Sequence, residues 1–318
     1  MEVNYINKKL VNIYNNKDIP PVFRDYIKLT VIGMIMYYGD EYADLILDSI
    51  NDIDFYYGID SLIKDSTFDT KQVEAWINNA EPAFTLHSFT RFSKNSKQLP
   101  VIDVKYGICV RDNITVNNIV FLEYIVHEIN HIVCSKNNSF FKDEDNNIGY
   151  RTGFFTAYFK SKDKKNGKGR IFNEVINSLM TEDIINIILN IQDQELDSFI
   201  DSLRKSTTED QYYVQGYLGL TNLFRTLFNI EEFKSFSKRC LIDGNVEDMD
   251  ELFNAVLGNN KYDELLDKLD CYYKDYLLAY RSKKQCTLFN ISTQYIDIKD
   301  NYVGLFLEKK YQRKLAFK

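Results

Sequence analysis

The segment from 117 to 135, NNIVFLEYIVHEINHIVCS, places the tightest limit on how this chain of 318 residues folds. Its apolar residues recur at three- and four-residue steps, which is the period of a helix. They surround most of that helix, so we expect other elements to cover it on most sides. The same segment holds His127 and His131, two of the three histidines in the chain. Two imidazoles on a buried helix need a partner for their ring nitrogens.

His127, Glu128 and His131 match the pattern H-E-x-x-H. A four-residue step is just over one helical turn, so both imidazoles project from one face and can meet one ion. Zn²⁺ binds such nitrogens in a tetrahedral arrangement. Glu128 lies about 100° further round the helix, where its carboxylate can take a proton from a metal-bound water. The pattern therefore predicts one zinc ion per chain, with Glu128 as the general base.

A catalytic zinc ion needs a third protein ligand, and four residues are candidates. Glu174 is the best of them because it is a carboxylate on a helix predicted at 170–191, whose other face is apolar. Glu182 on the same helix is its nearest rival. His87 lies alone in an upstream segment, and Cys134 lies so close to the histidines that its thiolate would be badly angled. We therefore favour Glu174.

His127-Glu128-x-x-His131, followed by Asn173-Glu174 on a later helix, resembles the gluzincin branch of the zincin metallopeptidases. In that branch the first helix supplies two histidines and the base, and the later helix supplies the third ligand. The resemblance implies that His127, His131 and Glu174 hold Zn²⁺. It also implies peptide-bond hydrolysis by a zinc-bound water that Glu128 activates, with a peptide or protein as substrate.

The resemblance covers about residues 99–190 and carries two further implications. The strand predicted at 101–110 would be the family's edge strand, which binds an extended peptide by backbone pairing. A Tyr, His or Arg would stabilise the oxyanion of the tetrahedral intermediate. The candidates for that donor are Tyr150, Arg151, Tyr212, Tyr213, Tyr217 and His87.

The patterning along the chain predicts an α+β fold that is predominantly helical, with a small sheet. A helical N-terminal region is expected at 1–98, and a helical C-terminal region that closes the cleft at 192–318. Between them, 99–191 would form a zincin-like catalytic core. Strict alternation predicts a strand at 101–110. Strands are also expected at 149–160 and at 286–298.

Composition narrows the class of partner and the compartment. The net charge of −7 and the pI of about 5.2 argue against a protein that binds the phosphate backbone of nucleic acids. The N-terminus shows no secretory signal, and no apolar run is long enough to span a bilayer. Five cysteines without a C-x-x-C pair fit a reduced, cytoplasmic protein.

Two other classes of protein are compatible with the H-E-x-x-H motif. The zincin fold could serve as a non-catalytic regulatory or protein-binding module, but such modules usually lose the base, and Glu128 is present. Peptide deformylase also uses H-E-x-x-H and takes a cysteine ligand from an upstream strand. Cys109, in YGICV, has the wrong neighbours for that role. The sequence therefore favours a zinc metallopeptidase.

Overall fold

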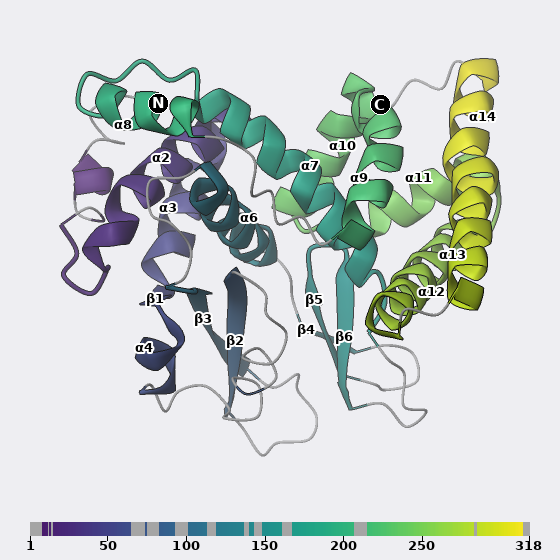
Figure 1. The fold of residues 1–318 in the computed structure, drawn as a ribbon, viewed down its shortest axis with the longest axis horizontal. Coiled ribbons are helices and arrows are strands. Elements are labelled where there is room, and N and C mark those ends of the chain that lie inside the picture. The colour runs from purple at the N-terminus through teal and green to yellow at the C-terminus, as the bar shows by residue number, and fades with distance from the viewer. Residues whose placement is uncertain are drawn as a thin grey trace. The chain divides into compact units, whose positions relative to one another are not determined.

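The structure is a computed structural model that divides into two compact units, Met1–Lys136 with Thr181–Tyr212, and Asn137–Met180 with Tyr213–Lys318. It describes residues 8–11, 13, 15–64, 74, 83–92, 101–112, 119–136, 140–142, 148–160, 167–206, 215–282 and 285–313. Of these, only the backbone is described at 83–92, 101–105, 140–142, 159–160, 215–218, 280–289 and 311–313. Helices predominate, and the described part of each unit has one three-stranded sheet (Figure 1). The mostly helical α+β class is confirmed.

The first unit combines helices with the sheet β1–β3–β2. Its helices are α2 (Pro21–Tyr38), the short 3₁₀ helix η1 (Asp40–Tyr42), α3 (Ala43–Asn51), α4 (Ile59–Ile63), α6 (Ile119–Ser135) and α8 (Asp197–Lys205). Its strands are β1 (Ile53–Tyr57), β2 (Ala83–Phe92) and β3 (Val101–Val110). The region 1–98, expected to be helical, thus contains two strands, because short aromatic and β-branched runs interrupt its helical patterning.

The strand predicted at 101–110 is confirmed as β3, but the expectation that it is an edge strand is wrong. β3 lies between β1, which pairs with it in parallel at Tyr106–Val110, and β2, which pairs with it antiparallel along its whole length. Residues 106 to 110 are all buried, so both faces of this part are covered. Within the described residues, β1 and β2 are the edge strands of this sheet, because strand order depends on pairing that local alternation does not encode.

Helix α6 is the central helix of the first unit, as its apolar surface predicts. It contacts α2 and α3 as well as β2 and β3. Seven apolar side chains account for this burial: Phe121, Leu122, Ile125, Val126, Ile129, Ile132 and Val133. Helix α7 (Arg170–Ile188) contributes its C-terminal half to the same unit. There, Gly33 of α2 allows Ile188 to approach so closely that an added Cβ would lie 2.4 Å from its Cγ1.

The second unit holds the sheet β4–β5–β6, the N-terminal half of α7 and a set of later helices. Its strands are β4 (Phe140–Lys142), β5 (Ile148–Thr152) and β6 (Phe155–Lys160). The later helices are α9 (Gln215–Phe228), α10 (Glu231–Ile242), α11 (Glu247–Leu257), α12 (Lys261–Ser282), α13 (Gln285–Ile298), the π-helix η3 (Lys299–Gly304) and α14 (Leu305–Arg313).

Two strand predictions in this unit need correction. The single strand expected at 149–160 is a hairpin, because Gly153 turns the chain between β5 and β6 with a φ of +54°. The strand expected at 286–298 is helix α13. Its apolar residues Leu288, Ile291, Tyr295 and Ile298 recur at steps of three and four, and α13 packs against α12. The helical period therefore prevails over the local β propensity.

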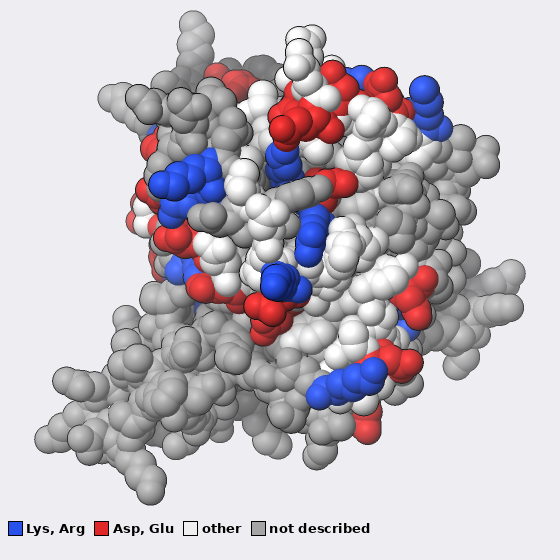
Figure 2. All heavy atoms as spheres, turned by 90° about the vertical axis from the view of Figure 1, so that its left-hand side faces the viewer, with Lys and Arg blue, Asp and Glu red and all other residues white. Residues whose placement is uncertain are grey.

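Charged side chains of both signs are mixed on the face drawn in Figure 2, where Lys and Arg lie among Asp and Glu. In the first unit, for example, Lys28 pairs with Glu195 at 2.8 Å and Lys136 pairs with Asp52. No described helix has both the length and the apolar character that crossing a bilayer requires.

Candidate metal centre

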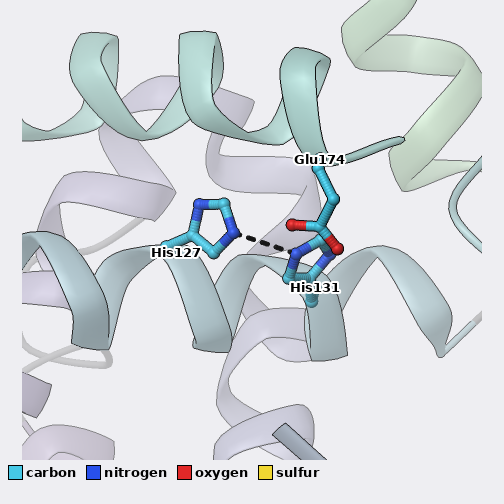
Figure 3. A group of neighbouring side chains, drawn as sticks. All are labelled: His127, His131 and Glu174. Carbon is cyan, nitrogen blue, oxygen red and sulfur yellow. Dashed lines mark hydrogen bonds between the residues drawn. The ribbon is translucent and has the colours of Figure 1, made fainter. Parts of the chain in front are cut away.

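His127 and His131 meet on one face of α6, as their spacing predicts. Their Nε2 atoms lie 3.1 Å apart, and the rings stand nearly perpendicular at 85° with centroids 4.7 Å apart (Figure 3). Both side chains are half-buried on a helix that is mostly buried. The two nitrogens therefore point at a common position rather than into separate surroundings.

Glu174 joins the two histidines. One ligand atom from each of His127, His131 and Glu174 lies within 4.8 Å of the other two, and Figure 3 shows the carboxylate of Glu174 directed at His131. Among the described side chains, this is the group of His, Cys, Asp and Glu residues close enough to hold a metal ion. Glu182 and Cys134 are described and do not belong to it. The side chain of His87, on β2, lies outside the described residues.

The geometry of the two imidazoles fits a bound ion. Two ligands at 2.0–2.1 Å from a tetrahedral metal ion lie about 3.3–3.4 Å apart, close to the observed Nε2–Nε2 separation of 3.1 Å. Without an ion, the same separation is a hydrogen bond between the two ring nitrogens, in which the tautomers set the donor and the acceptor. Two nitrogens and one carboxylate oxygen form a ligand set found at zinc sites. The group can therefore hold a metal ion.

Glu128 follows His127 directly on α6 and is half-buried. One residue along a helix corresponds to a rotation of about 100°, so its carboxylate leaves the helix beside the histidine face. Of the motif residues, Glu128 thus has a place next to the metal group without belonging to it.

Side-chain hydrogen bonds reach backbone groups at both ends of α6. The first backbone N–H of the helix, on Ile119, donates to Oγ of Ser206 at 2.9 Å. At the other end, Oγ of Ser135 donates to the carbonyl of His131 at 2.5 Å. The first contact satisfies an N–H that a helix start leaves without an intrahelical partner, whereas the second is a bond within α6 to the carbonyl four residues earlier.

A buried polar cluster forms around Asn130, the residue that directly precedes His131 on α6. Oδ1 of Asn130 accepts a hydrogen bond from the Tyr38 hydroxyl at 2.6 Å, and Sγ of Cys134 lies 3.4 Å from that hydroxyl. Burial raises the pKa of the Tyr38 phenol and raises the pKa of the Cys134 thiol to about 12. Both groups are therefore neutral, and Cys134 serves this cluster rather than the metal group.

The start of α7, which carries Glu174, is fixed by Asp270 of α12. Its carboxylate accepts hydrogen bonds from the backbone N–H groups of Gly169 and Ile171, both at 3.2 Å. Burial raises the pKa of Asp270, while these two hydrogen bonds act in the opposite direction. Asp270 therefore caps α7 from a distant helix, a role that Ser, Thr, Asp or Asn usually fills locally.

The two residues before Glu174 attach the first turn of α7 to other parts of the second unit. Oδ1 of Asn173 accepts the backbone N–H of Phe154 at 2.8 Å. The ring of Phe172 packs in an aromatic cluster with Phe154, Phe224, Phe253 and Tyr262, at centroid distances of 5.0 to 6.1 Å. The direction in which Glu174 leaves α7 is thus set by its two preceding neighbours.

The oxyanion candidates remain unassigned. Tyr150 is buried in β5, and Arg151 forms an ion pair with Glu247. Tyr212 and Tyr213 lie outside the described residues, as does the side chain of Tyr217.

Sequence reasoning missed Tyr38, Asn130 and Asp270, which hold the two helices of the site. Asn130 offered a signal, since it is a polar residue inside a helix otherwise covered by apolar side chains. Tyr38 and Asp270 offered none, because each acts on a segment far away in the sequence. No family model matches the chain, and comparison with curated proteins and with solved structures finds no match.

Proposed function

We propose that this protein is a zinc-dependent metallopeptidase of the gluzincin type, with one Zn²⁺ per chain held by His127, His131 and Glu174. The observation that carries the proposal is the approach of these three side chains, whose ligand atoms lie within 4.8 Å of one another. Two of them come from an H-E-x-x-H helix, and the third comes from a helix that begins more than 30 residues later in the chain. Two imidazole nitrogens and a carboxylate oxygen that converge in this way match the three protein ligands of a catalytic zinc site.

When bound, the zinc ion would lower the pKa of a water ligand to about 7 and polarise the scissile carbonyl. Glu128 would accept the proton that the attacking water loses. It would then donate this proton to the amine nitrogen that leaves when the C–N bond breaks. Glu128 can do both because it stands beside the ligand face of α6 without being a ligand.

The substrate would be an extended peptide that pairs with β2. The sheet order moves the edge position from β3 to β2, which runs antiparallel to β3 and pairs on one side only within the described sheet. β2 also contacts α6, the helix of the two histidines. A peptide added to this edge would gain main-chain hydrogen bonds along the strand.

Elemental mass spectrometry of the purified protein tests the ligand set. The wild type should contain about one zinc per chain, Glu174→Ala should lose most of it, and Glu182→Ala should keep it. Glu182 is a matched control because it lies on the same helix as a half-buried carboxylate outside the metal group. If zinc were lost from Glu182→Ala but kept in Glu174→Ala, the third ligand would be Glu182 and not Glu174. A wild type without zinc after reconstitution would overturn the proposal.

A second measurement separates enzyme from binding module. The zinc-loaded wild type should hydrolyse members of a library of unstructured peptides. Zinc binding without hydrolysis of any peptide would contradict the peptidase assignment and would favour a non-catalytic module built on the same metal site.

A further inference from the structure

The hydrogen bond between Tyr38 and Asn130 is a buried polar contact on the same helix as the two histidines of the metal group. Asn130 is fully buried, and Tyr38 is 4% exposed. Their 2.6 Å contact joins α2 to α6 across 92 residues of sequence. A buried amide is costly without a partner, and an apolar residue would fill this position at no such cost. We therefore expect this polar pair to have a role other than filling the core.

The position of Asn130 on α6 supplies that reason. Asn130 directly precedes His131, and at 100° per residue it lies about 60° round the helix from His127. Glu128 lies on the other side of the histidine face, about 100° from His127. Any roll of α6 about its axis would therefore move both imidazoles and Glu128 together.

A small rotation of α6 about its own axis would be enough to disrupt the metal site. Side-chain ends lie about 5–6 Å from a helix axis, so a roll of about 10° moves an imidazole nitrogen by about 1 Å. Metal–ligand distances tolerate only about 0.2 Å. Apolar packing has no direction and permits such small rolls, whereas a hydrogen bond weakens steeply as its angle departs from linearity.

We propose that Tyr38 and Asn130 are positioning residues, whose hydrogen bond fixes the roll of α6 and so aims His127 and His131 at the metal. Cys134, one turn after Asn130, closes the cluster with its neutral thiol 3.4 Å from the Tyr38 hydroxyl. The inference rests on the proposed function, since it assigns these residues to the metal site of that function.

Three variants of the full chain test the inference. Tyr38→Phe removes the donor and keeps the ring. Tyr38→Phe with Asn130→Leu replaces both partners by apolar groups of the same branching, which should restore much of the stability without restoring the directional contact. Ile27→Val is the matched control, because Ile27 is a fully buried apolar residue of the same helix as Tyr38. For each, we would measure the melting temperature without metal, the Kd for Zn²⁺ by chelator competition, and the visible spectrum with Co²⁺.

Tyr38→Phe should weaken zinc binding about tenfold, the effect typical of a residue that orients a metal ligand. The double variant should recover its melting temperature while zinc binding stays weak and the Co²⁺ spectrum stays altered. Ile27→Val should lower the melting temperature and leave the Kd unchanged. A Kd within twofold of the wild type in Tyr38→Phe, or a Kd that recovers together with the melting temperature, would overturn the inference and leave the proposed function standing. A wild type that binds no zinc would overturn both.

Discussion

The carboxylate of Asp270 accepts the backbone N–H of Ile171 at 3.2 Å, so a residue of α12 caps the helix that carries Glu174. The two residues are 99 positions apart in the chain. The second carboxylate oxygen accepts the N–H of Gly169, and both N–H groups belong to the set that every helix start leaves without intrahelical partners. The start of α7 therefore depends on the folding of the later helices.

Removing this cap should destabilise the protein. Asp270→Ala leaves the N–H groups of Gly169 and Ile171 without their acceptor, and we expect a loss of about 1–2 kcal/mol in the free energy of unfolding. Urea unfolding at pH 7 measures it. Asp275→Ala is a control on the same helix, since the Asp275 carboxylate accepts a hydrogen bond from the side chain of Gln294 at 2.8 Å. Equal losses in the two variants would contradict the capping role.

The same residue should give a pH dependence of defined sign. Burial is the main cause that raises the pKa of Asp270 in the folded protein, so the folded state binds the proton more tightly than the unfolded state. The raised pKa therefore adds to the free energy of unfolding at low pH. This added stability is fully present below the unfolded pKa of about 3.9, and it is lost as pH rises through the folded pKa.

The difference in unfolding free energy between wild type and Asp270→Asn isolates this contribution, because the other carboxyl groups titrate in both proteins. We expect this difference, wild type minus variant, to fall as pH rises above about 4 and then to level off. A difference that rises with pH would mean that the two backbone hydrogen bonds outweigh burial.

Gly153→Ala should be destabilising. Gly153 has a φ of +54°, and an added Cβ would lie 2.2 Å from Oδ1 of Asn173, the atom that accepts the N–H of Phe154. Strain at the turn and a displaced hydrogen bond together should cost about 1–3 kcal/mol. Gly219→Ala, in helix α9, is the matched control, since the nearest atoms to an added Cβ would be those of Tyr295 and Tyr272 at 3.8 and 3.9 Å. It should leave stability unchanged or raise it by up to about 1 kcal/mol. Similar effects of both substitutions on the melting temperature would refute this account.

Glu128→Gln should separate metal binding from chemistry. Under the proposed function, Glu128 moves protons and does not bind the ion, so the variant should keep about one zinc per chain. Peptide hydrolysis should fall by about 10²–10⁴-fold, the range that general acid–base catalysis supplies. Elemental mass spectrometry and a peptide-cleavage assay on one preparation measure both quantities. Zinc loss in Glu128→Gln would make Glu128 a ligand, and unchanged cleavage would remove it from the mechanism.

The buried cysteines should resist alkylation. Burial raises the pKa of Cys109, Cys134 and Cys240 to about 12, and the thiolate is the reactive form. All four cysteines with described side chains are thiols, and Cys271 is exposed. Iodoacetamide at pH 7.5 should therefore label Cys271 well before the other three, as peptide mapping can show. The same reaction in urea, where all should react, is the control. Early labelling of Cys134 in the folded protein would contradict the buried cluster with Tyr38.

Local patterns were enough to predict the elements that carry the site. The apolar period predicts a helix at 117–135, and α6 spans Ile119–Ser135. The helix predicted at 170–191 is α7, and alternation predicts β3 correctly. The shared face of His127 and His131 also follows from their four-residue spacing, because the geometry of a helix is set by its own backbone.

Only the tertiary structure decided what those elements meet. Glu174 and Glu182 lie on the same helix, but among the described side chains Glu174 is the one that groups with the two histidines. The first turn of that helix is held by Asp270 and Phe154. β3 proved to be a central strand because pairing partners come from elsewhere in the chain. The sequence by itself thus determined the two-histidine helix, since helical period and spacing are local properties. The third ligand and the strand order required the tertiary structure, since both arise from contacts between residues far apart in the chain.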